Sequence, residues 1–404
     1  MPPGVGKLTK LETLTTFIVG VEEGFRIQEL KDLDELRGSL ALSNLDNVRE
    51  ESEATDARLN FKKFLRKVEF QWSRLESKAE KTLEKLLPPH QFLTELKILY
   101  YGGAKFPSWL GMSKFSSLAT ISLTNCRKCT QLPTLGKLPW LKSLKLEELH
   151  AIEEINHDVF CGHGEFEGFP KLESLEIDGM RRLERWTGMV EGQMPLLRRL
   201  IIIDCPSLTI LPELLYLHSL QHLKISLCSK LLSLPEEGLP KLVQLLIIME
   251  CPELENRCKM GGYNWHKIEH IPNIWIGYRR ISGTKPLEQC IADLNSIKRV
   301  EGSTPTRIEG MFLTTAKGVQ ITKAEFVHHS DDDDYGWRKY SEKNIPLSKF
   351  PRRYYRCIQG TSKGCSARKH VQQLDDDPNM SRVIYFGHHT CVMSCSLSST
   401  HTAK

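Results

Sequence analysis

The sequence predicts an α/β leucine-rich-repeat solenoid, followed by a small all-β zinc-binding domain with four or five antiparallel strands. Three observations support this prediction. A leucine pattern recurs through the first two thirds of the chain, four cysteine and histidine residues near its end have metal-ligand spacing, and basic residues alternate with aromatic ones between those ligands. Of the 404 residues, 40% are hydrophobic and 26% are charged, so the chain has enough apolar residues for a substantial core.

The leucine pattern, Leu-x-x-Leu-x-Leu/Ile, defines the repeats. Its clear copies begin 23 to 31 residues apart, at Leu93, Leu118, Leu141, Leu172, Leu197, Leu220 and Val243. Weaker copies begin at Leu11, Leu40 and Leu65, which gives about ten units. In leucine-rich repeats each unit contributes one short strand, and the inward-facing apolar side chains become buried only when neighbouring units stack. We therefore predict a solenoid over residues 1–275.

Four cysteines stand eight residues after the first position of their repeat, at Cys126, Cys205, Cys228 and Cys251. Leucine-rich repeats have Asn or Cys at this position, where the side chain bonds to the backbone of the turn, so we interpret these cysteines as structural. Cys126 and Cys129 have the spacing of half a zinc site, but no second pair stands at a suitable distance. The repeat role therefore explains Cys126 better than metal binding does.

Several segments of the repeats resemble the repeat region of plant NLR immune receptors. They are Tyr101–Leu110 (YGGAKFPSWL), Leu132–Gly136 (LPTLG) and Trp265–Pro272 (WHKIEHIP). The resemblance covers about residues 1–275 and implies that the repeats bind a protein partner, such as a pathogen effector or an immune regulator.

Receptors of that family carry a nucleotide-binding ATPase domain before the repeats. The segment Gly4-Val5-Gly6-Lys7-Leu8 is a partial match to its phosphate loop, but no glycine stands five residues before Gly6, and Leu8 replaces the Ser or Thr that would hold magnesium. We therefore expect no nucleotide to bind, and we expect the chain to be a truncated receptor or an incomplete gene product.

The remaining chain divides into three parts. Residues 276–330 show no sustained period and predict a linker, residues 331–395 predict the zinc domain, and residues 396–404 predict a flexible tail. No run of eighteen apolar residues is present, so we expect no membrane partner. The N-terminus lacks a secretory-signal pattern, so we expect the twelve cysteines to be thiols or metal ligands.

Four residues of the predicted zinc domain have metal-ligand identity and ordered spacing. Seven, twenty-three and one residues separate Cys357, Cys365, His389 and Cys391. Three thiolates and one imidazole form a closed, tetrahedral, structural zinc site. A domain of this size buries too little apolar surface to be stable unaided, so one structural Zn²⁺ would supply folding energy.

The same region is strongly basic. Between residues 335 and 391 there are eleven Lys and Arg residues against four Asp and Glu residues, a local balance of +7. Such a concentration of positive charge suits a surface that binds phosphates. A solvated basic face without a partner is the alternative interpretation of the charge alone.

Four segments of this region resemble a plant WRKY domain of the class whose last ligands are His-x-Cys. They are Trp337–Tyr340 (WRKY), Lys349–Cys357 (KFPRRYYRC), Gly364–Gln372 (GCSARKHVQ) and Tyr385–Cys391 (YFGHHTC). The resemblance implies that the strand containing Trp337 enters the major groove of double-stranded DNA, at a W-box with a TGAC core. It also implies a role in plant defence transcription in the nucleus, with the cytoplasm as an additional location.

The resemblance also assigns residues to this interface. It implies that Arg338, Lys339, Tyr340 and Lys343 contact base edges and backbone. It implies phosphate contacts, which position the protein without specifying sequence, for Lys349, Arg352, Tyr354, Arg356 and Lys369. We expect Trp337 to lie in the core of the domain.

The predicted reading strand departs from the family at two positions. Where the family has Gly-Gln-Lys, this chain has Ser341-Glu342-Lys343. Ser341 adds bulk where glycine allows close approach, and Glu342 places a negative charge near phosphates. Because a carboxylate can accept a hydrogen bond from cytosine N4, altered specificity and weaker binding are both open.

Two functions fit these observations. The first is a sequence-specific DNA-binding transcription factor with a protein-binding repeat region. The second is a fragment of an immune receptor whose WRKY domain acts as an integrated decoy for pathogen effectors. The sequence contains no nucleophile–base motif, open metal site or phosphate loop, so we do not expect an enzyme.

Overall fold

The computed structural model describes residues 3–73, 79–156, 168–277, 279–296, 321–328, 336–343, 350–358, 365, 367–373 and 380–386. The chain forms two compact units. The first comprises Met1–Gly277 and Ile281–Thr284, and the second comprises Tyr278–Arg280 and Lys285–Lys404. In the described part of the chain, no helix is long and apolar enough to cross a membrane.

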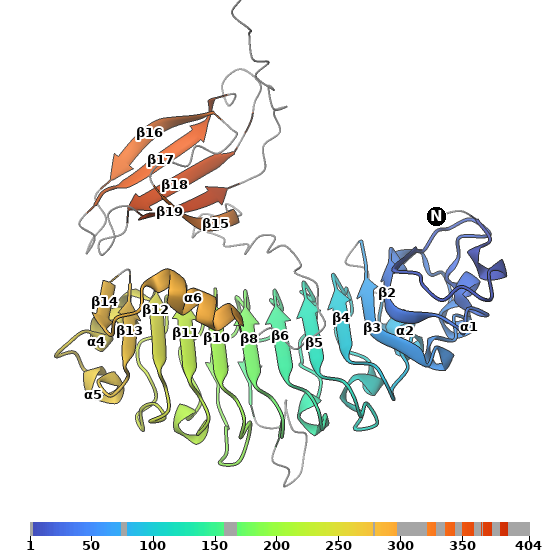
Figure 1. Cartoon of the computed structure of the whole chain (residues 1–404), viewed down its shortest axis with the longest axis horizontal. Coiled ribbons are helices and arrows are strands. Elements are labelled where there is room, and N and C mark those ends of the chain that lie inside the picture. The colour runs from blue at the N-terminus through green and yellow to red at the C-terminus, as the bar shows by residue number, and fades with distance from the viewer. Residues whose placement is uncertain are drawn as a thin grey trace, which may run out of the picture. The chain divides into compact units, whose positions relative to one another are not determined.

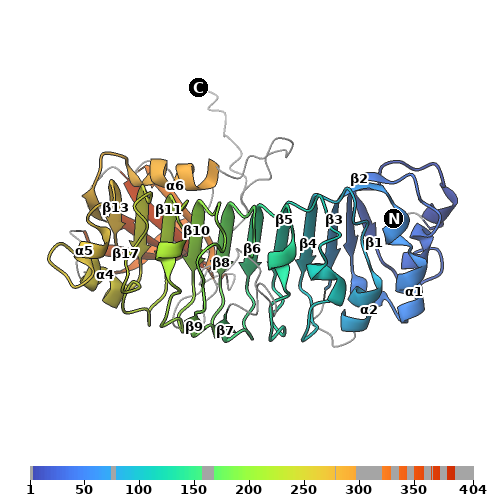
Figure 2. The same ribbon diagram turned by 90° about the horizontal axis from the view of Figure 1, so that it is seen from below.

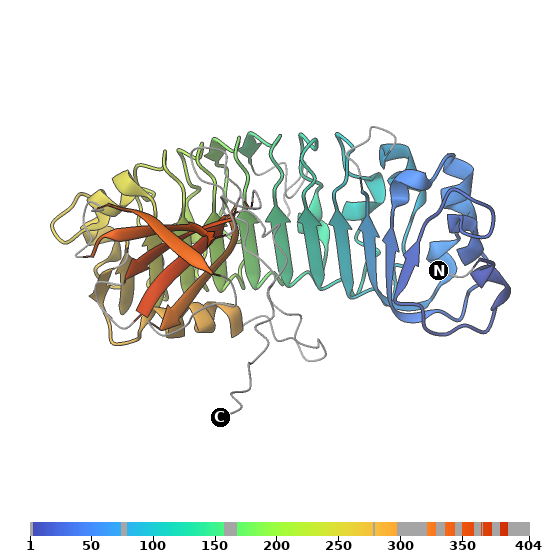
Figure 3. The same ribbon diagram turned by 90° about the horizontal axis from the view of Figure 1, so that it is seen from above.

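A sheet of twelve strands runs the length of the repeats (Figures 1 and 3). Neighbouring strands from the first to the eleventh of this sheet are parallel. In sheet order the strands are β1 (Thr16–Ile18), β2 (Arg37–Ser43), β3 (Phe64–Gln71), β4 (Glu95–Leu99), β5 (Thr120–Thr124), β6 (Ser143–Glu147), β8 (Ser174–Asp178), β10 (Arg199–Ile203), β11 (His222–Ser226), β12 (Leu245–Met249), β13 (Asn273–Ile276) and β14 (Arg279–Ser282).

Short helices and turns complete the coil of each repeat. Figure 2 shows the parallel pair β7 (Glu154–Ile155) and β9 (Arg185–Trp186) along the opposite side of the coil from the large sheet. The α-helices of this part are α1 (Glu51–Asp56), α2 (Ala79–Lys85), α4 (Pro252–Cys258) and α5 (Trp265–Ile268). The 3-10 helices are Val5–Lys7, Ile27–Leu30, Leu45–Asn47, Leu59–Phe61, Ser108–Gly111, Leu135–Lys137 and Leu214–Tyr216.

The leucine pattern builds the core through strand register. Leu200 of β10 pairs with Leu175 of β8 and with Leu223 of β11, and all three side chains are fully buried. Two residues further along, Ile202 continues a second buried ladder in the same way. Each buried side chain of this size stabilises the fold by about 1.5–3 kcal/mol relative to an exposed one, so stacking of the repeats creates the core.

The predicted fold class is confirmed, and each predicted repeat contributes one strand. Two further strands, β13 and β14, follow the last predicted copy. In β13 the inward positions are Ile274 and Ile276, which pair with Leu246 and Ile248 of β12. With Ile271, these isoleucines repeat the spacing of the leucine pattern, but isoleucine stands where the pattern has leucine, so a search for leucines does not find this strand.

The repeat cysteines satisfy the backbone of the turn, as predicted. The residue before each of them has a left-handed backbone, for example Asp204 with φ of 47° and Leu227 with φ of 58°. The thiol of Cys205 donates to the Ile203 carbonyl at 3.4 Å, and the thiol of Cys228 donates to the Ser226 carbonyl at 3.4 Å. Burial raises the pKa of the equivalent Cys126 to about 12, so that cysteine is an unreactive thiol.

The second unit contains one antiparallel sheet of five strands, which confirms the predicted four or five. In sheet order they are β15 (Ile321–His328), β19 (Met380–Phe386), β18 (Arg368–Gln373), β17 (Arg352–Cys357) and β16 (Trp337–Lys343). Helix α6 (Leu287–Ser296) and strand β15 lie within residues 276–330, for which the sequence predicts a linker. The division of the chain at residues 275, 330 and 395 stays a prediction.

Candidate nucleic-acid interface

Strand β16, which contains the Trp-Arg-Lys-Tyr segment, is the outer strand of the five-stranded sheet (Figure 1). Within the described residues it pairs with β17 alone, so its other edge carries backbone groups that no described strand covers. Exposed charged side chains, Arg338 and Lys339 among them, line this strand. Charged residues on an edge strand discourage pairing with another sheet, while a single strand of this kind fits the major groove of DNA.

A β-bulge at Tyr340 changes which side chains β16 exposes. Lys339 lies opposite Tyr355 of β17 and Ser341 lies opposite Tyr354, so Tyr340 is an extra residue without a register partner. In a regular strand, successive side chains point to opposite faces. Arg338, Lys339 and Tyr340 are three successive exposed residues on the outer strand, and Tyr340 is 47% exposed. The extra residue shifts the alternation after Tyr340, so Lys343 shares a face with Arg338 and Tyr340, while Glu342 lies on the other face.

Strand register gathers most of the predicted DNA contacts on one face of the sheet, which we call the basic face. Arg338 lies opposite Arg356, which lies opposite Arg368 of β18, and Lys343 lies opposite Arg352. The rings of Tyr340 and Tyr354 are 6.3 Å apart. The predicted contacts that share the basic face are Arg338, Tyr340, Lys343, Arg352, Tyr354 and Arg356.

The described part of the structure does not place the other three predicted contacts on the basic face. Lys339 lies opposite Tyr355, which lies opposite Lys369, so register places both lysines on the other face. Lys349 lies outside the described residues. The sheet therefore brings together six of the nine residues that the resemblance assigns to DNA.

The cationic side chains of the basic face repel one another when no anion is bound. Like charges directly opposite each other destabilise a sheet, and Arg338–Arg356 and Lys343–Arg352 are such pairs. Burial, and then the charges of Arg352 and Arg368, lower the pKa of His370 to about 4. His370 is therefore neutral at pH 7, and its ring packs against Tyr354 at 4.5 Å.

Arg368 and His370 belong to the basic face but were not in the predicted contact set. A signal for them exists in the sequence, because the two residues are separated by one position in a strand, as Arg352 and Tyr354 are. A period of two places such pairs on one face. The sequence does not show how β17 pairs with β18, however. It therefore does not show that Arg368 and His370 lie on the same face as Arg356.

The two residues that depart from the family pattern have defined surroundings. The carboxylate of Glu342 forms an ion pair with the Lys339 ammonium on the same strand. This hydrogen bond, together with the nearby charge of Arg353, lowers the pKa of Glu342 below its ordinary value. Ser341 is partly buried at the bulge.

Trp337 packs into the interior of the sheet domain, as the sequence predicts. It contacts the buried cluster of Cys357, Cys365 and Ala367. Its ring lies 5.9 Å from the ring of Tyr385, and the Lys369 ammonium lies 4.9 Å from the Trp337 ring.

Two of the four predicted zinc ligands are brought together by this cluster. Cys357 and Cys365 are 3% and 5% exposed, and the Cys357 amide donates to the Ala367 carbonyl at 3.0 Å. His389 and Cys391 lie outside the described residues, among which no group of three or more possible ligands occurs.

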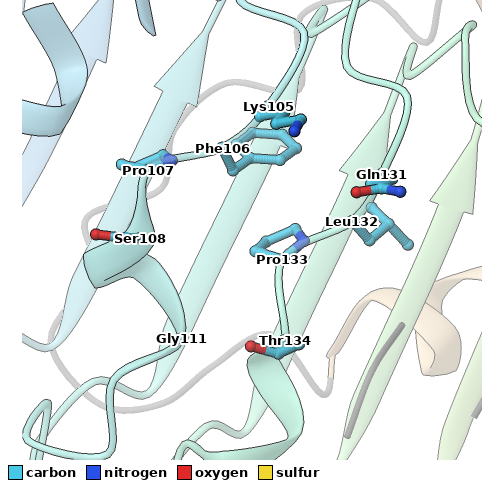
Figure 4. Close-up of a pocket in the computed structure, with 9 residues that line it drawn as sticks. All are labelled: Lys105, Phe106, Pro107, Ser108, Gly111, Gln131, Leu132, Pro133 and Thr134. Atoms are coloured by element: carbon cyan, nitrogen blue, oxygen red, sulfur yellow. The ribbon is translucent and has the colours of Figure 1, made fainter. Parts of the chain in front are cut away.

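The first unit has a small hollow between equivalent segments of two successive repeats. Figure 4 shows its lining residues, which are Lys105, Phe106, Pro107, Ser108, Gly111, Gln131, Leu132, Pro133 and Thr134. Lys105 is the one ionisable side chain among them. General acid–base chemistry needs groups that can exchange protons near neutral pH, and this lining does not provide them.

Comparison with protein-family models agrees with this geometry. The model of the WRKY DNA-binding domain matches residues 332–392. Residues 332–392 are a WRKY domain. The model of the R13L1/DRL21 leucine-rich repeats matches residues 27–149. The chain therefore joins leucine-rich repeats of the plant disease-resistance type to a C-terminal WRKY domain.

Relatives match one part of the chain or the other. Disease resistance protein RGA2 of Solanum bulbocastanum is 34% identical over 264 residues, which are 62% of this chain and 26% of that protein. WRKY transcription factor 55 of Arabidopsis thaliana is 52% identical over 63 residues, which are 16% of this chain and 22% of that protein. The chain spans about a quarter or less of the first disease-resistance relatives that it matches.

A solved structure also matches the WRKY domain. It is the crystal structure of in planta processed AvrRps4 in complex with the WRKY domain of RRS1, with 41% identity and a TM-score of 0.15. The match covers 16% of this chain and 100% of that chain.

Proposed function

We propose that the WRKY domain binds double-stranded DNA at W-box-like sites with a TGAC core, and that the protein acts as a transcription factor in plant defence in the nucleus. One observation carries the proposal most directly. The outer strand β16 exposes Arg338, Lys339 and Tyr340 in succession, and the bulge at Tyr340 brings Lys343 onto the face of Arg338 and Tyr340. A charged edge strand with a row of donors is what recognition of base edges in the major groove needs.

The basic face supplies the second part of the proposed interface. Base contacts specify a sequence, whereas contacts to phosphates fix the register and orientation of the protein on the duplex. We assign base-edge and backbone contacts to Arg338, Lys339, Tyr340 and Lys343 of β16. Phosphate contacts then fall to Arg352, Tyr354 and Arg356, whose strand lies directly beside β16, with Lys349 as a further contact.

One zinc ion is proposed to hold this sheet together through Cys357, Cys365, His389 and Cys391. The support is that Cys357 and Cys365 belong to one buried cluster, against which Trp337, the first residue of the reading strand, packs. Metal binding at a site of this kind supplies folding energy and no chemistry. The ion would therefore fix the start of β16 relative to β17.

The leucine-rich repeats are proposed to bind a protein partner. Their relatives in Solanum bulbocastanum and Arabidopsis thaliana are named disease resistance proteins, which supports a pathogen effector or an immune regulator as that partner.

A mobility-shift titration of the full chain tests the DNA proposal. Duplexes that contain TGAC, and duplexes of the same composition with that core scrambled, are compared at physiological salt. We expect the W-box duplex to bind at least tenfold more tightly, because each mismatched base pair costs about 1–3 kcal/mol. Equal affinity for the two duplexes would contradict the proposal.

A second candidate function is an immune-receptor fragment whose WRKY domain is an integrated decoy for pathogen effectors. The ion pair between Glu342 and Lys339 supports it, because this pair neutralises a cation of the reading strand. So does the disease-resistance type of the repeats. The two candidates are separated by effector binding in parallel with the DNA titration. A decoy binds an effector tightly and shows no preference between the W-box and scrambled duplexes.

A further inference from the structure

Lys369 of β18 lies among three aromatic rings that belong to three other strands. Its ammonium is 4.9 Å from the ring of Trp337 on β16, 5.8 Å from that of Tyr355 on β17, and 5.8 Å from that of Tyr385 on β19. A cation within about 6 Å of a ring centroid is attracted by the ring quadrupole. One side chain therefore connects the four strands β16 to β19.

The position of this cluster links it to the reading strand. Trp337 directly precedes Arg338, the first exposed residue of the row on β16. Trp337 is also the residue through which β16 contacts the buried Cys357 and Cys365. A change in the orientation of the Trp337 ring would therefore move the backbone at the start of the row.

The location of Lys369 does not suit a phosphate contact of the basic face. Register places it on the other face, opposite Tyr355 and Tyr385. Lys369 is also only partly exposed, whereas Arg356, its counterpart on the basic face, is exposed. A partly desolvated cation over rings contributes more than an exposed one, and its charge is less available to a phosphate in solvent.

We propose that Lys369 is a positioning residue, which fixes the orientation of Trp337 and so aligns β16 for reading DNA. This inference rests on the proposed DNA binding. It differs from the phosphate contact that the family resemblance assigns to Lys369. A phosphate contact raises the affinity for all DNA sequences alike, whereas alignment of the reading strand raises the affinity for the preferred sequence.

Salt dependence distinguishes the two roles in the full-length chain. Fluorescence anisotropy measures the affinity for W-box and scrambled duplexes between about 50 and 200 mM salt, a range over which phosphate contacts change affinity strongly. The variants are Lys369→Met, which keeps the length without the charge, Lys369→Arg, which keeps a cation over the rings, and Arg356→Met as the matched control on the basic face.

We expect Lys369→Met to weaken W-box binding about three- to thirtyfold, the range that corresponds to a cation–π contact. Its salt slope and its affinity for the scrambled duplex should equal those of the unmodified chain, and Lys369→Arg should restore W-box affinity. Arg356→Met should lower the salt slope by about one and weaken both duplexes alike. The inference is overturned if Lys369→Met behaves as Arg356→Met does.

A measurement without DNA separates this inference from the proposed function. If the unmodified chain does not prefer the W-box duplex, the proposed function fails, and hydrogen–deuterium exchange of Trp337–Lys343 tests the positioning role. Lys369→Met should accelerate exchange in this strand, while Lys369→Arg should not. Equal exchange in all three proteins contradicts the positioning role, whatever the outcome with DNA.

Discussion

Glu342 forms an ion pair with Lys339, three residues earlier on the outer strand β16. The pair places the carboxylate that departs from the WRKY pattern directly against one of the cations assigned to DNA. A lysine that is already paired must break that contact before it can bind a phosphate or a base edge. We therefore expect the departure to weaken the proposed DNA binding in two ways, by repulsion of phosphates and by occupation of Lys339.

Replacement of Glu342 by Gln is expected to strengthen DNA binding. Removal of the carboxylate releases Lys339 and also removes a repulsion of phosphates, so the affinity should rise about two- to tenfold. Anisotropy titrations at low and physiological salt measure this gain. Glu22→Gln, which removes the same charge from an exposed position of the repeats, should leave the affinity unchanged. No gain from Glu342→Gln would show that the ion pair does not limit binding.

Ser341 lies at the bulge of the same strand. Its replacement by Gly should change the affinity for DNA and the stability of the domain in opposite directions. Glycine has no Cβ and allows a closer approach of backbone to DNA, but it costs about 0.5–1 kcal/mol in a strand. We expect tighter binding by Ser341→Gly together with a lower free energy of unfolding. Ser341→Ala keeps the Cβ and should bind as the unmodified chain does. If Ala improves affinity as much as Gly, the hydroxyl rather than the bulk of the side chain is responsible.

The lowered pKa of His370 predicts a loss of stability in mild acid. Below pH 6.5 the histidine of the unfolded chain takes up a proton, whereas the folded chain does not until the pH approaches about 4. Stability from this residue is therefore lost as the pH falls through that window. Thermal unfolding at pH 7 and pH 5 measures it, and His370→Gln should lose less stability over this interval than the unmodified chain. Equal losses would mean that His370 is not held neutral.

Truncation of a leucine in the buried row that runs across neighbouring strands should destabilise the repeats. Leu200 is fully buried between Leu175 and Leu223, so Leu200→Ala leaves a cavity and should cost about 2–5 kcal/mol. Leu242, which is 57% exposed, provides a control of the same residue type, and Leu242→Ala should change stability by less than about 0.5 kcal/mol. Urea denaturation followed by circular dichroism compares the two. Equal effects would contradict the assignment of Leu200 to the core.

The repeat fold was predictable because the residues of its core recur at a fixed spacing along the sequence. Leu200 and Ile202 stand at fixed positions of the leucine pattern, and the register of parallel strands then follows from stacking of the repeats. Strand β13 was not predicted, although Ile271, Ile274 and Ile276 have the spacing of the pattern, because isoleucine stands where leucine marks the other units. One copy of this spacing without leucine does not distinguish a repeat strand from any other short apolar segment.

The sequence names residues for the proposed DNA interface, whose contacts stay a prediction, but it does not show how they are arranged. The segment Trp337–Tyr340 and the basic residues after it identify the strand and its chemistry. The bulge at Tyr340 depends on how β16 pairs with β17, and this pairing has no local signal. The rings around Lys369 come from three different strands, so the sequence shows a lysine among basic residues and predicts a phosphate contact. Only the sheet reveals its aromatic surroundings.

The central claim is that one zinc ion organises a basic sheet whose outer strand reads DNA. Zinc content, measured on the purified full-length chain by mass spectrometry before and after chelation, tests it most directly when the same samples are titrated with the W-box duplex. The account predicts one zinc per chain, and loss of W-box recognition when that zinc is removed. A chain that contains no stoichiometric zinc and still prefers the W-box duplex would contradict it.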